Sequence, residues 1–327
     1  MGALRFLLAL SVAYGHLGAF LGFPLVPGDT AVQCFFIVSG FYMSLVLNGK
    51  YEHAGYWLFL SNRLLRLYPV YLAVFAATVL LATPPRPRLD ALGWLYFAVS
   101  QLTLFGQDAV MFLAIKSGAL AFTSNFNQSS GNLFEFSVVP QAWTLGVELW
   151  FYLLAPLVLR RSPAVIVGLF VGSIVLRMVL QLWFGLSGDP WSYRFFPSEL
   201  ALFLLGAIAH RLDRKSLIVA AVTVAVVLFI NRAGGPGRLA SVSFLAAAAV
   251  SIPWLFAKTQ CIEADKFLGE LSYPIYLVHI LAGSLIAGAV PAFLATLAAA
   301  VAIYLLVDRP IDRWRQSRLT RAAPALA

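Results

Sequence analysis

Arg5 and His16 lie eleven residues apart in the first apolar segment, LRFLLALSVAYGHLGAF, residues 4–20. Ionisable groups inside a membrane span are costly to insert, so such residues commonly have a functional role. On an α-helix, eleven residues give about 16 Å of rise and about 20° of net rotation, so both side chains share one face. Histidine titrates near neutral pH and can take a proton from a reacting group. The pair predicts a site in which Arg5 holds the charged end of a long ligand and His16, near mid-depth, meets its reactive end.

The composition of the chain is that of a polytopic membrane protein. Hydrophobic residues make up 61% of the sequence and charged residues 11%, whereas soluble domains carry about 25% charged residues. The net charge of +9 does not indicate nucleic-acid binding, because the cations gather at helix ends and in short loops, as orientation signals do. Cys34 and Cys261 support neither a disulfide framework nor a zinc site.

Eleven apolar stretches have spanning or near-spanning length. We therefore predict an all-α fold, a polytopic transmembrane helix bundle with about 10–12 spans, in which residues 1–327 form a single membrane domain. The stretches fall near residues 4–22, 31–48, 68–83, 91–106, 142–159, 164–184, 197–212, 216–231, 239–257, 271–289 and 291–308.

The basic residues predict that both termini are cytoplasmic, because positive loops stay on that side. The loop at 49–67 shares this signal, but eleven crossings cannot place both ends inside. We expect residues 91–123 to make the number of crossings even. They would do so either as a re-entrant segment or as an extra short crossing through AVMFLAIKSGALAF. The polar stretch TSNFNQSSGN, residues 123–132, then lies outside. The basic positions are Arg160, Arg161, Arg211, Arg214 and Lys215, with Arg309, Arg313, Arg315, Arg318 and Arg321 in the tail.

Further local patterns accompany Arg5 and His16 in a fixed order. They are FFIVSGF at residues 35–41, RLLRLYP at 63–69, WTLGVELWFY at 143–152, SYPIYLVH at 272–279 and VDRPIDRWR at 307–315. Together they resemble the acyltransferase 3 family of integral membrane acyltransferases, and the resemblance runs from residue 4 to about residue 315. WTL stands where WSL is commoner, and the terminal acidic residue is Asp308 in place of Glu.

The resemblance implies an acyl transfer, usually of acetyl, from cytoplasmic acyl-CoA to a hydroxyl of a glycan or lipid-linked sugar. It implies His16 as the catalytic histidine and Arg5 as its companion, with Glu148 supporting the site. We expect donor-binding residues in the two motifs that lie between His16 and Glu148 in the sequence: Ser39, Arg63, Arg66 and Tyr68. Acetyl-CoA would be a donor substrate, with no permanently bound cofactor, and the expected location is the bacterial inner membrane.

The same chemistry follows from the residue types. The acceptor hydroxyl must lose its proton as its oxygen attacks the thioester. General-base catalysis by a histidine typically raises the rate of such a step by about 10²–10⁴-fold. A carboxylate can orient the imidazole, and Glu148 and Asp308 are the candidates. Arginines recognise the phosphate charges of the donor, and Arg5, Arg63 and Arg66 would cluster on the cytoplasmic side.

Each of these residues also has a structural interpretation. Arg5 could extend its head group to the interface, and His16 could hydrogen-bond between helices. His279, inside an apolar helix start, could be structural, and a catalytic part for it stays open. Arg63 and Arg66 could serve as orientation signals. Ser39 and Gly40 could allow close helix packing, Glu148 could be a hydrated interfacial group, and Asp308 could cap the last helix.

Two other functions remain open from the sequence. A transporter or flippase of lipid-linked sugars would use buried Arg, His and Glu in a proton relay, although no repeat with broken helices is evident. A non-catalytic subunit of a polysaccharide assembly complex is the other. The histidines and carboxylates show no metal-ligand spacing, and the expected partners are acyl-CoA, a glycan acceptor and the bilayer, with a homodimer left open.

Overall fold

The computed structural model describes residues 1–23, 25–231 and 237–322. It confirms the all-α polytopic fold, with 75% of the chain in helices and 3% in strands. The chain forms two compact units, one from residues 1–31, 46–83 and 254–327 and the other from residues 32–45 and 84–253. The expectation of a single membrane domain stays a prediction.

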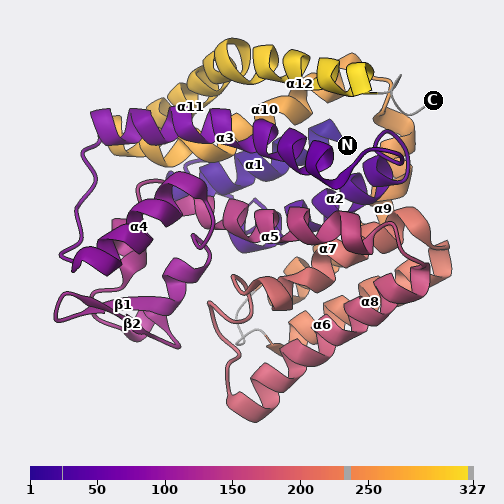
Figure 1. Ribbon diagram of the computed structural model, residues 1–327, viewed down its shortest axis with the longest axis horizontal. Coiled ribbons are helices and arrows are strands. Elements are labelled where there is room, and N and C mark those ends of the chain that lie inside the picture. Colours follow the sequence, from indigo (N-terminus) through magenta and orange to yellow (C-terminus); the bar gives the residue numbers. More distant parts are fainter. Residues whose placement is uncertain (24, 232–236, 323–327) are drawn as a thin grey trace. The chain divides into compact units, whose positions relative to one another are not determined.

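The first unit is built on helix α10, which pairs with α1 and also contacts α3 and α11 (Figure 1). A π-helical segment, η5, joins α11 to α12 without a loop between them. The bounds are α1 Gly2–His16, α3 Tyr56–Leu81, α10 Glu263–Leu285, α11 Ala289–Ile303, η5 Tyr304–Asp308 and α12 Arg309–Ala322.

Helices α1 and α10 run parallel and almost touch at their backbones. A Cβ atom placed on Gly269 would lie 2.9 Å from the Cα atom of Gly2, and one on Gly283 would meet Leu17 at 2.6 Å. Small residues of this kind let membrane helices approach closely, so that dispersion and hydrogen bonds can hold them. The pairing brings the N-terminal helix against a segment more than 260 residues later in the chain.

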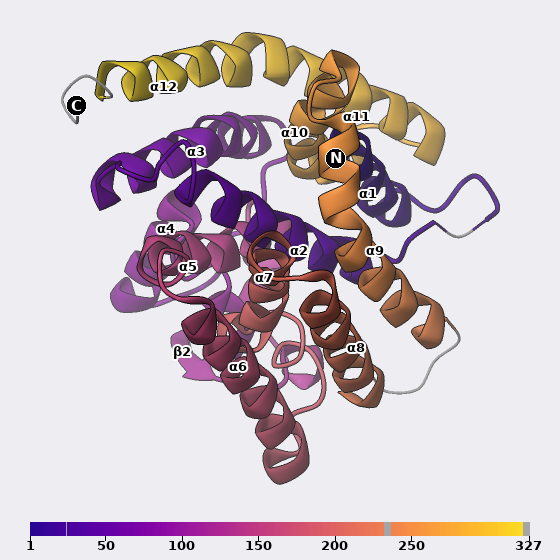
Figure 2. The same ribbon diagram turned by 90° about the vertical axis from the view of Figure 1, so that its right-hand side faces the viewer.

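The second unit contains the remaining helices and a small hairpin. Helices α6, α7 and α8 contact one another and lie side by side (Figure 2). The bounds are α2 Gly28–Leu47, α4 Ala91–Thr103, α5 Trp143–Val158, α6 Pro163–Phe184, α7 Phe196–Arg211, α8 Arg214–Asn231 and α9 Arg238–Thr259; the outer turns of α2 and the end of α9 belong to the first unit.

Residues 113–122 form a β-hairpin, so the extra short crossing predicted there is wrong. Strands β1 (Leu113–Lys116) and β2 (Ala119–Phe122) pair in antiparallel register. Ser117 and Gly118 between them have φ angles of 51° and 85°, which suit the two-residue turns that match strand twist. An open two-stranded hairpin cannot span lipid, because its edges leave backbone groups without hydrogen bonds.

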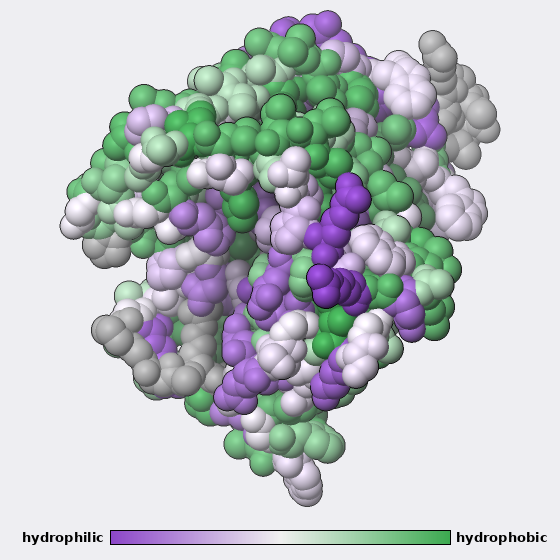
Figure 3. Space-filling model, turned by 90° about the vertical axis from the view of Figure 1, so that its left-hand side faces the viewer, coloured by the Kyte–Doolittle hydropathy of each residue, from purple (hydrophilic) through white to green (hydrophobic). Residues whose placement is uncertain are grey.

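Five helices among the described residues are long and apolar enough to cross a membrane: Gly28–Leu47, Tyr56–Leu81, Pro163–Phe184, Arg238–Thr259 and Ala289–Arg318. Their outer surfaces carry large apolar side chains, such as Leu80 and Trp183, which are 77% and 83% exposed. Figure 3 shows hydrophobic side chains over large areas of one face. Soluble proteins rarely expose such patches, so this surface is matched to lipid.

Three helix boundaries differ from the sequence-based expectation. Helix α1 ends at His16, because the following residues turn back and Gly18 and Ala19 take positive φ angles. Helix α3 begins at Tyr56, so the segment predicted as a basic loop at 49–67 is largely helical. The last helix does not end at Asp308, since η5 continues directly into α12. The alternative in which Asp308 only caps the C-terminal end of the last helix is therefore excluded.

The glycine of FFIVSGF is required for packing between α2 and α7. A Cβ atom on Gly40 would lie 1.8 Å from the carbonyl oxygen of Phe203, so one of the two backbones would have to move. Such overpacking costs about 1–3 kcal/mol. We expect Gly40→Ala to lower the midpoint of thermal unfolding in detergent, followed by tryptophan fluorescence.

Gly168→Ala on α6 is the matched control, because nothing lies within 4 Å of the added Cβ atom. Alanine is a better helix former than glycine by about 1 kcal/mol, so this variant should keep or raise the unfolding midpoint. Equal midpoints for Gly40→Ala and the unsubstituted protein would contradict the packing role.

Candidate functional site

His16 and His279 face each other across the α1–α10 pair. His16 Nδ1 lies 2.9 Å from His279 Nε2, and His279 Nδ1 lies 2.8 Å from the carbonyl oxygen of Tyr276. His279 is fully buried, whereas His16 is exposed at the end of α1. An accessible imidazole backed by a buried hydrogen-bonding ring is suited to taking a proton from a bound reactant.

Arg5 lies on the same helix as His16 but near its opposite end. Its guanidinium is beside Gly269 of α10, since a Cβ atom there would lie 3.6 Å from Arg5 Nη1. Helix α1 is continuous from Gly2 to His16, and eleven residues of α-helix rise about 16 Å. Arg5 therefore cannot hydrogen-bond His16 directly, and a common ligand would have to extend along the helix pair.

Glu148 and Ser39, both singled out from the sequence, meet in the second unit. Ser39 Oγ donates to Glu148 Oε1 at 2.7 Å, and Tyr152 OH donates to the same oxygen at 2.7 Å. Both hydrogen bonds end on the same carboxylate oxygen and therefore fix the orientation of the Glu148 side chain. Ser39 belongs to the FFIVSGF motif and Tyr152 follows Glu148 by one helical turn, so α2 and α5 build this cluster together.

The basic residues of α3 have different surroundings. Arg63 is 7% exposed, and its guanidinium lies 5.6 Å from the ring centres of both Tyr51 and Phe59. Arg66 is half-buried and interacts electrostatically with Asp308 and Asp312 near the start of α12. An arginine held between aromatic rings or acidic groups is oriented, but part of its charge is already balanced.

Tyr68 follows on the same helix, half-buried beside Tyr71. Helix α3 is tied to α10 one residue earlier, because Tyr273 OH donates to the carbonyl oxygen of Leu67 at 2.7 Å. The motif RLLRLYP thus lies directly against the helix that carries His279.

A polar cluster at η5 was only partly anticipated from the sequence. Tyr304 hydrogen-bonds the Glu270 side chain, and Asp308 interacts with both Glu270 and Arg66. π-helical segments are rare and often occur at functional positions. Asp308 was predicted as a partner for the imidazole; here its described partners are the arginine and carboxylates of this cluster. Glu270 was missed, although it lies two residues before the SYPIYLVH motif.

A buried ion pair in the second unit was not predicted from the sequence. Arg177 Nη2 lies 2.6 Å from Glu199 Oε1, with the side chains 4% and 0% exposed. Arg177 also donates to the carbonyl oxygens of Ser192 and Ser198, and Gln33 approaches Glu199 at 3.4 Å. Charged residues in otherwise apolar helix sequences were the available signal.

The WTLGVE motif is fixed by its neighbours in the second unit. Arg194 lies 4.3 Å above the Trp143 ring and forms an ion pair with Asp189. Gly146 leaves room for the loop before η1 (Ala109–Phe112), since a Cβ atom there would approach Asp108 N at 3.0 Å. Burial raises the pKa of Asp108 to about 6, while hydrogen bonds from backbone amides and Trp150 lower it in part.

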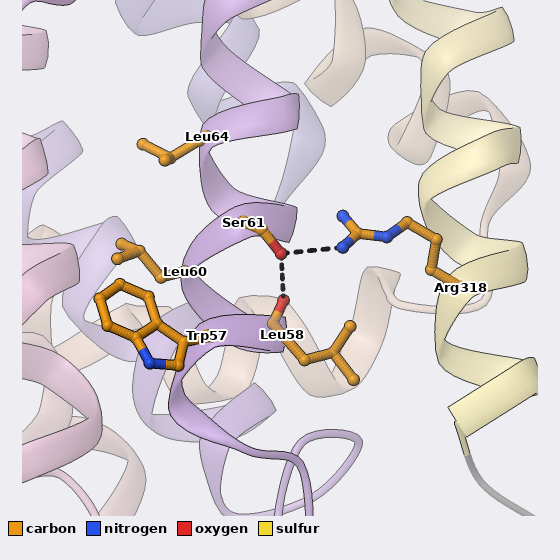
Figure 4. Close-up of a pocket in the computed structure, with 6 residues that line it drawn as sticks. All are labelled: Trp57, Leu58, Leu60, Ser61, Leu64 and Arg318. Atoms are coloured by element: carbon orange, nitrogen blue, oxygen red, sulfur yellow. Dashed lines mark hydrogen bonds between the residues drawn. The ribbon is translucent and has the colours of Figure 1, made fainter.

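A pocket of about 410 Å³ lies in the first unit, away from the histidine pair in sequence. Its lining is apolar except for Ser61 and Arg318, and Arg318 donates to Ser61 Oγ at 3.0 Å (Figure 4). The residues that line it are Trp57, Leu58, Leu60, Ser61, Leu64 and Arg318. Among the described residues no group of three His, Cys, Asp or Glu side chains is placed to hold a metal ion.

Comparison with known proteins gives one family match that spans most of the chain. Residues 1–307 match the acyltransferase 3 family, described as an acyltransferase domain. An uncharacterized protein of Aquifex aeolicus is 28% identical over 157 residues, which cover 44% of this chain and 69% of that protein. No solved structure matches the chain.

Asp265 of α10 holds the start of α1, the helix that ends at His16. Asp265 accepts hydrogen bonds from the backbone N–H groups of Gly2 and Ala3, each at 2.8 Å. Burial acts to raise the pKa of Asp265, but the hydrogen bonds from Ala3, the Met1 amino group and Gly2 outweigh it and hold this pKa well below its usual value.

A lowered carboxyl pKa stabilises the fold above the ordinary pKa of aspartate, about 3.9, and this contribution disappears as the pH falls through the lowered value. We expect Asp265→Asn to lower the thermal midpoint at pH 7 and the difference to shrink at about pH 3. Glu52→Gln, which changes an exposed carboxylate, is the control. A difference that does not depend on pH would contradict the assignment.

Proposed function

This chain belongs to the acyltransferase 3 family, and we propose that it is an O-acyltransferase that moves acetyl from acetyl-CoA to a hydroxyl of a glycan or lipid-linked sugar. The match over residues 1–307 confirms the resemblance drawn from the motifs and identifies a membrane acyltransferase. The observation that carries the proposal is the accessible His16 at the end of α1, hydrogen-bonded to His279.

In this proposal His16 is the general base. It removes the proton of the acceptor hydroxyl as the oxygen attacks the thioester carbonyl. His16 is the last residue of α1, where the negative end of the helix dipole favours a cation by about 0.3–1 kcal/mol. The helix end therefore stabilises the imidazolium that forms during the reaction.

The donor is proposed to be recognised by arginines of α1 and α3. Arg5, Arg63 and Arg66 supply planar guanidinium groups that can bind phosphate oxygens in pairs. Tyr68 follows them on α3, and Glu148 with Ser39 is proposed to support the site. The acetyl-CoA thus remains a substrate, with no cofactor held permanently.

The direct test is turnover of radiolabelled acetyl-CoA by the purified protein with a glycan or lipid-linked sugar acceptor. His16→Ala removes the base and should lower the rate by about 10²-fold or more. His53→Ala replaces an exposed histidine in the turn before α3 and should keep the rate of the unsubstituted protein.

Near-normal transfer by folded His16→Ala would refute the general-base role. If the unsubstituted protein labels no acceptor and hydrolyses no thioester, but moves a lipid-linked sugar across a vesicle membrane, the transporter alternative is supported instead.

The donor role predicts a particular kinetic change. Lysine keeps the charge of arginine but lacks its planar fork, so Arg5→Lys and Arg66→Lys should raise the apparent KM for acetyl-CoA with little change in kcat, as uniform binding groups do. Arg63→Lys should behave likewise, and Arg160→Lys, at an exposed position, is the control. Unchanged acetyl-CoA kinetics in all three variants would exclude the donor role.

The proposed orientation places both termini in the cytoplasm. A reporter fused after Arg321 and one inserted near His53 should read cytoplasmic, because basic loops are retained on that side. A tag within residues 124–131 should be accessible to an impermeant reagent from outside intact cells. Protection of that tag, with the C-terminus inside, would contradict the orientation.

A further inference from the structure

Three groups form a chain of hydrogen bonds that ends at the exposed ring of His16. The carbonyl oxygen of Tyr276 lies 2.8 Å from His279 Nδ1, and His279 Nε2 lies 2.9 Å from His16 Nδ1. The first two groups belong to α10 and the last to α1. Both bonds lie inside the first unit, at the close parallel contact of these helices.

The two imidazole rings meet end to end. Their planes differ by 10° and their centres are 5.0 Å apart, while the nearest nitrogens are only 2.9 Å apart. In face-to-face stacking the ring centres would lie about as close to each other as the nearest nitrogens do. Here the centres are much farther apart than the nitrogens, so the rings meet at their edges. The lone pair of one ring therefore points at the N–H of the other, as a ring hydrogen bond requires.

The carbonyl group fixes the direction of the whole chain. A carbonyl oxygen can only accept, so His279 Nδ1 carries the proton that it donates to Tyr276. A neutral imidazole then accepts at its other nitrogen. The neutral form is favoured because His279 is fully buried and a charged ring would lose its hydration. The proton between the two rings consequently belongs to His16 Nδ1.

We infer that His279 is a positioning residue that fixes His16 in the tautomer with Nδ1 protonated and Nε2 carrying the lone pair. The inference rests on the proposed function of His16 as the base. It makes Nε2 the atom that takes the acceptor proton, and it gives the SYPIYLVH motif a role that its sequence does not reveal. His279 itself contacts neither reactant in this scheme.

The transfer balances with this assignment. The acceptor O–H proton moves to His16 Nε2 as the acceptor oxygen forms a bond to the thioester carbonyl carbon. The carbon–sulfur bond then breaks, and the CoA thiolate takes the proton back from Nε2. The products are an O-acyl ester and CoA thiol, and the Nδ1 proton stays in its bond to His279 throughout.

The first test measures the tautomer directly and needs no activity. The chain has four histidines, so nitrogen NMR of protein labelled only in histidine gives few signals, which His16→Ala and His279→Leu assign. We expect a protonated Nδ1 and an unprotonated Nε2 on His16, with coupling across the hydrogen bond to His279 Nε2. A His16 ring protonated on Nε2, with Nδ1 as acceptor, would overturn the inference.

The second test separates positioning from packing. His279→Leu keeps a bulky side chain but removes the acceptor, and His279→Gln returns an amide oxygen. A wrong tautomer costs serine proteases about 10⁴-fold in kcat; here we expect His279→Leu to lower kcat by at least about 10-fold, with an unchanged KM for acetyl-CoA, and His279→Gln to recover part of it. His53→Leu is the control.

The two tests distinguish failure of the inference from failure of the proposed function. Unchanged kcat in folded His279→Leu, with the His16 tautomer retained, would overturn the positioning role. If the inferred tautomer is observed but His16→Ala still transfers acetyl at a normal rate, the general-base function fails while the proton assignment stands.

Discussion

The close parallel contact between α1 and α10 is the constraint on which the first unit depends. It requires glycine at positions 2 and 269, because a Cβ atom on either would collide with the facing backbone. Asp265 fixes the start of α1 through two backbone hydrogen bonds, and the histidine bond lies at its other end. A helix held at both ends keeps its terminal imidazole in one place, and a fixed position is what a reacting group requires.

Polar side chains in these apolar helices have specific hydrogen-bond or ion-pair partners. In the second unit Glu148 is satisfied by Ser39 and Tyr152, and Arg177 is neutralised by Glu199. Losing one member of such a buried pair is strongly destabilising, because the other charge is left without compensation. The Arg177–Glu199 pair therefore maintains the fold of the second unit.

The same consideration bears on the arginines proposed to bind the donor. Arg66 faces Asp308 of η5 and Asp312 of α12, and Arg63 lies between aromatic rings. Each is oriented by its neighbours before any phosphate arrives. Preorganised side chains lose less conformational entropy on binding, which is the advantage of holding a guanidinium in this way, while the acidic neighbours reduce the net positive charge that a donor would meet.

The sequence by itself determined the membrane class and the family, because composition, hydrophobic length and short ordered motifs are local properties. It also placed Arg5 and His16 on one helix correctly. Only the tertiary structure decided that α1 ends at His16, that residues 113–122 form a hairpin and that His279 is the partner of His16. These depend on which helices pack together: a hydrogen bond between residues 263 positions apart has no signature in either segment, and a turn at Ser117 and Gly118 outweighs the apolar composition around it.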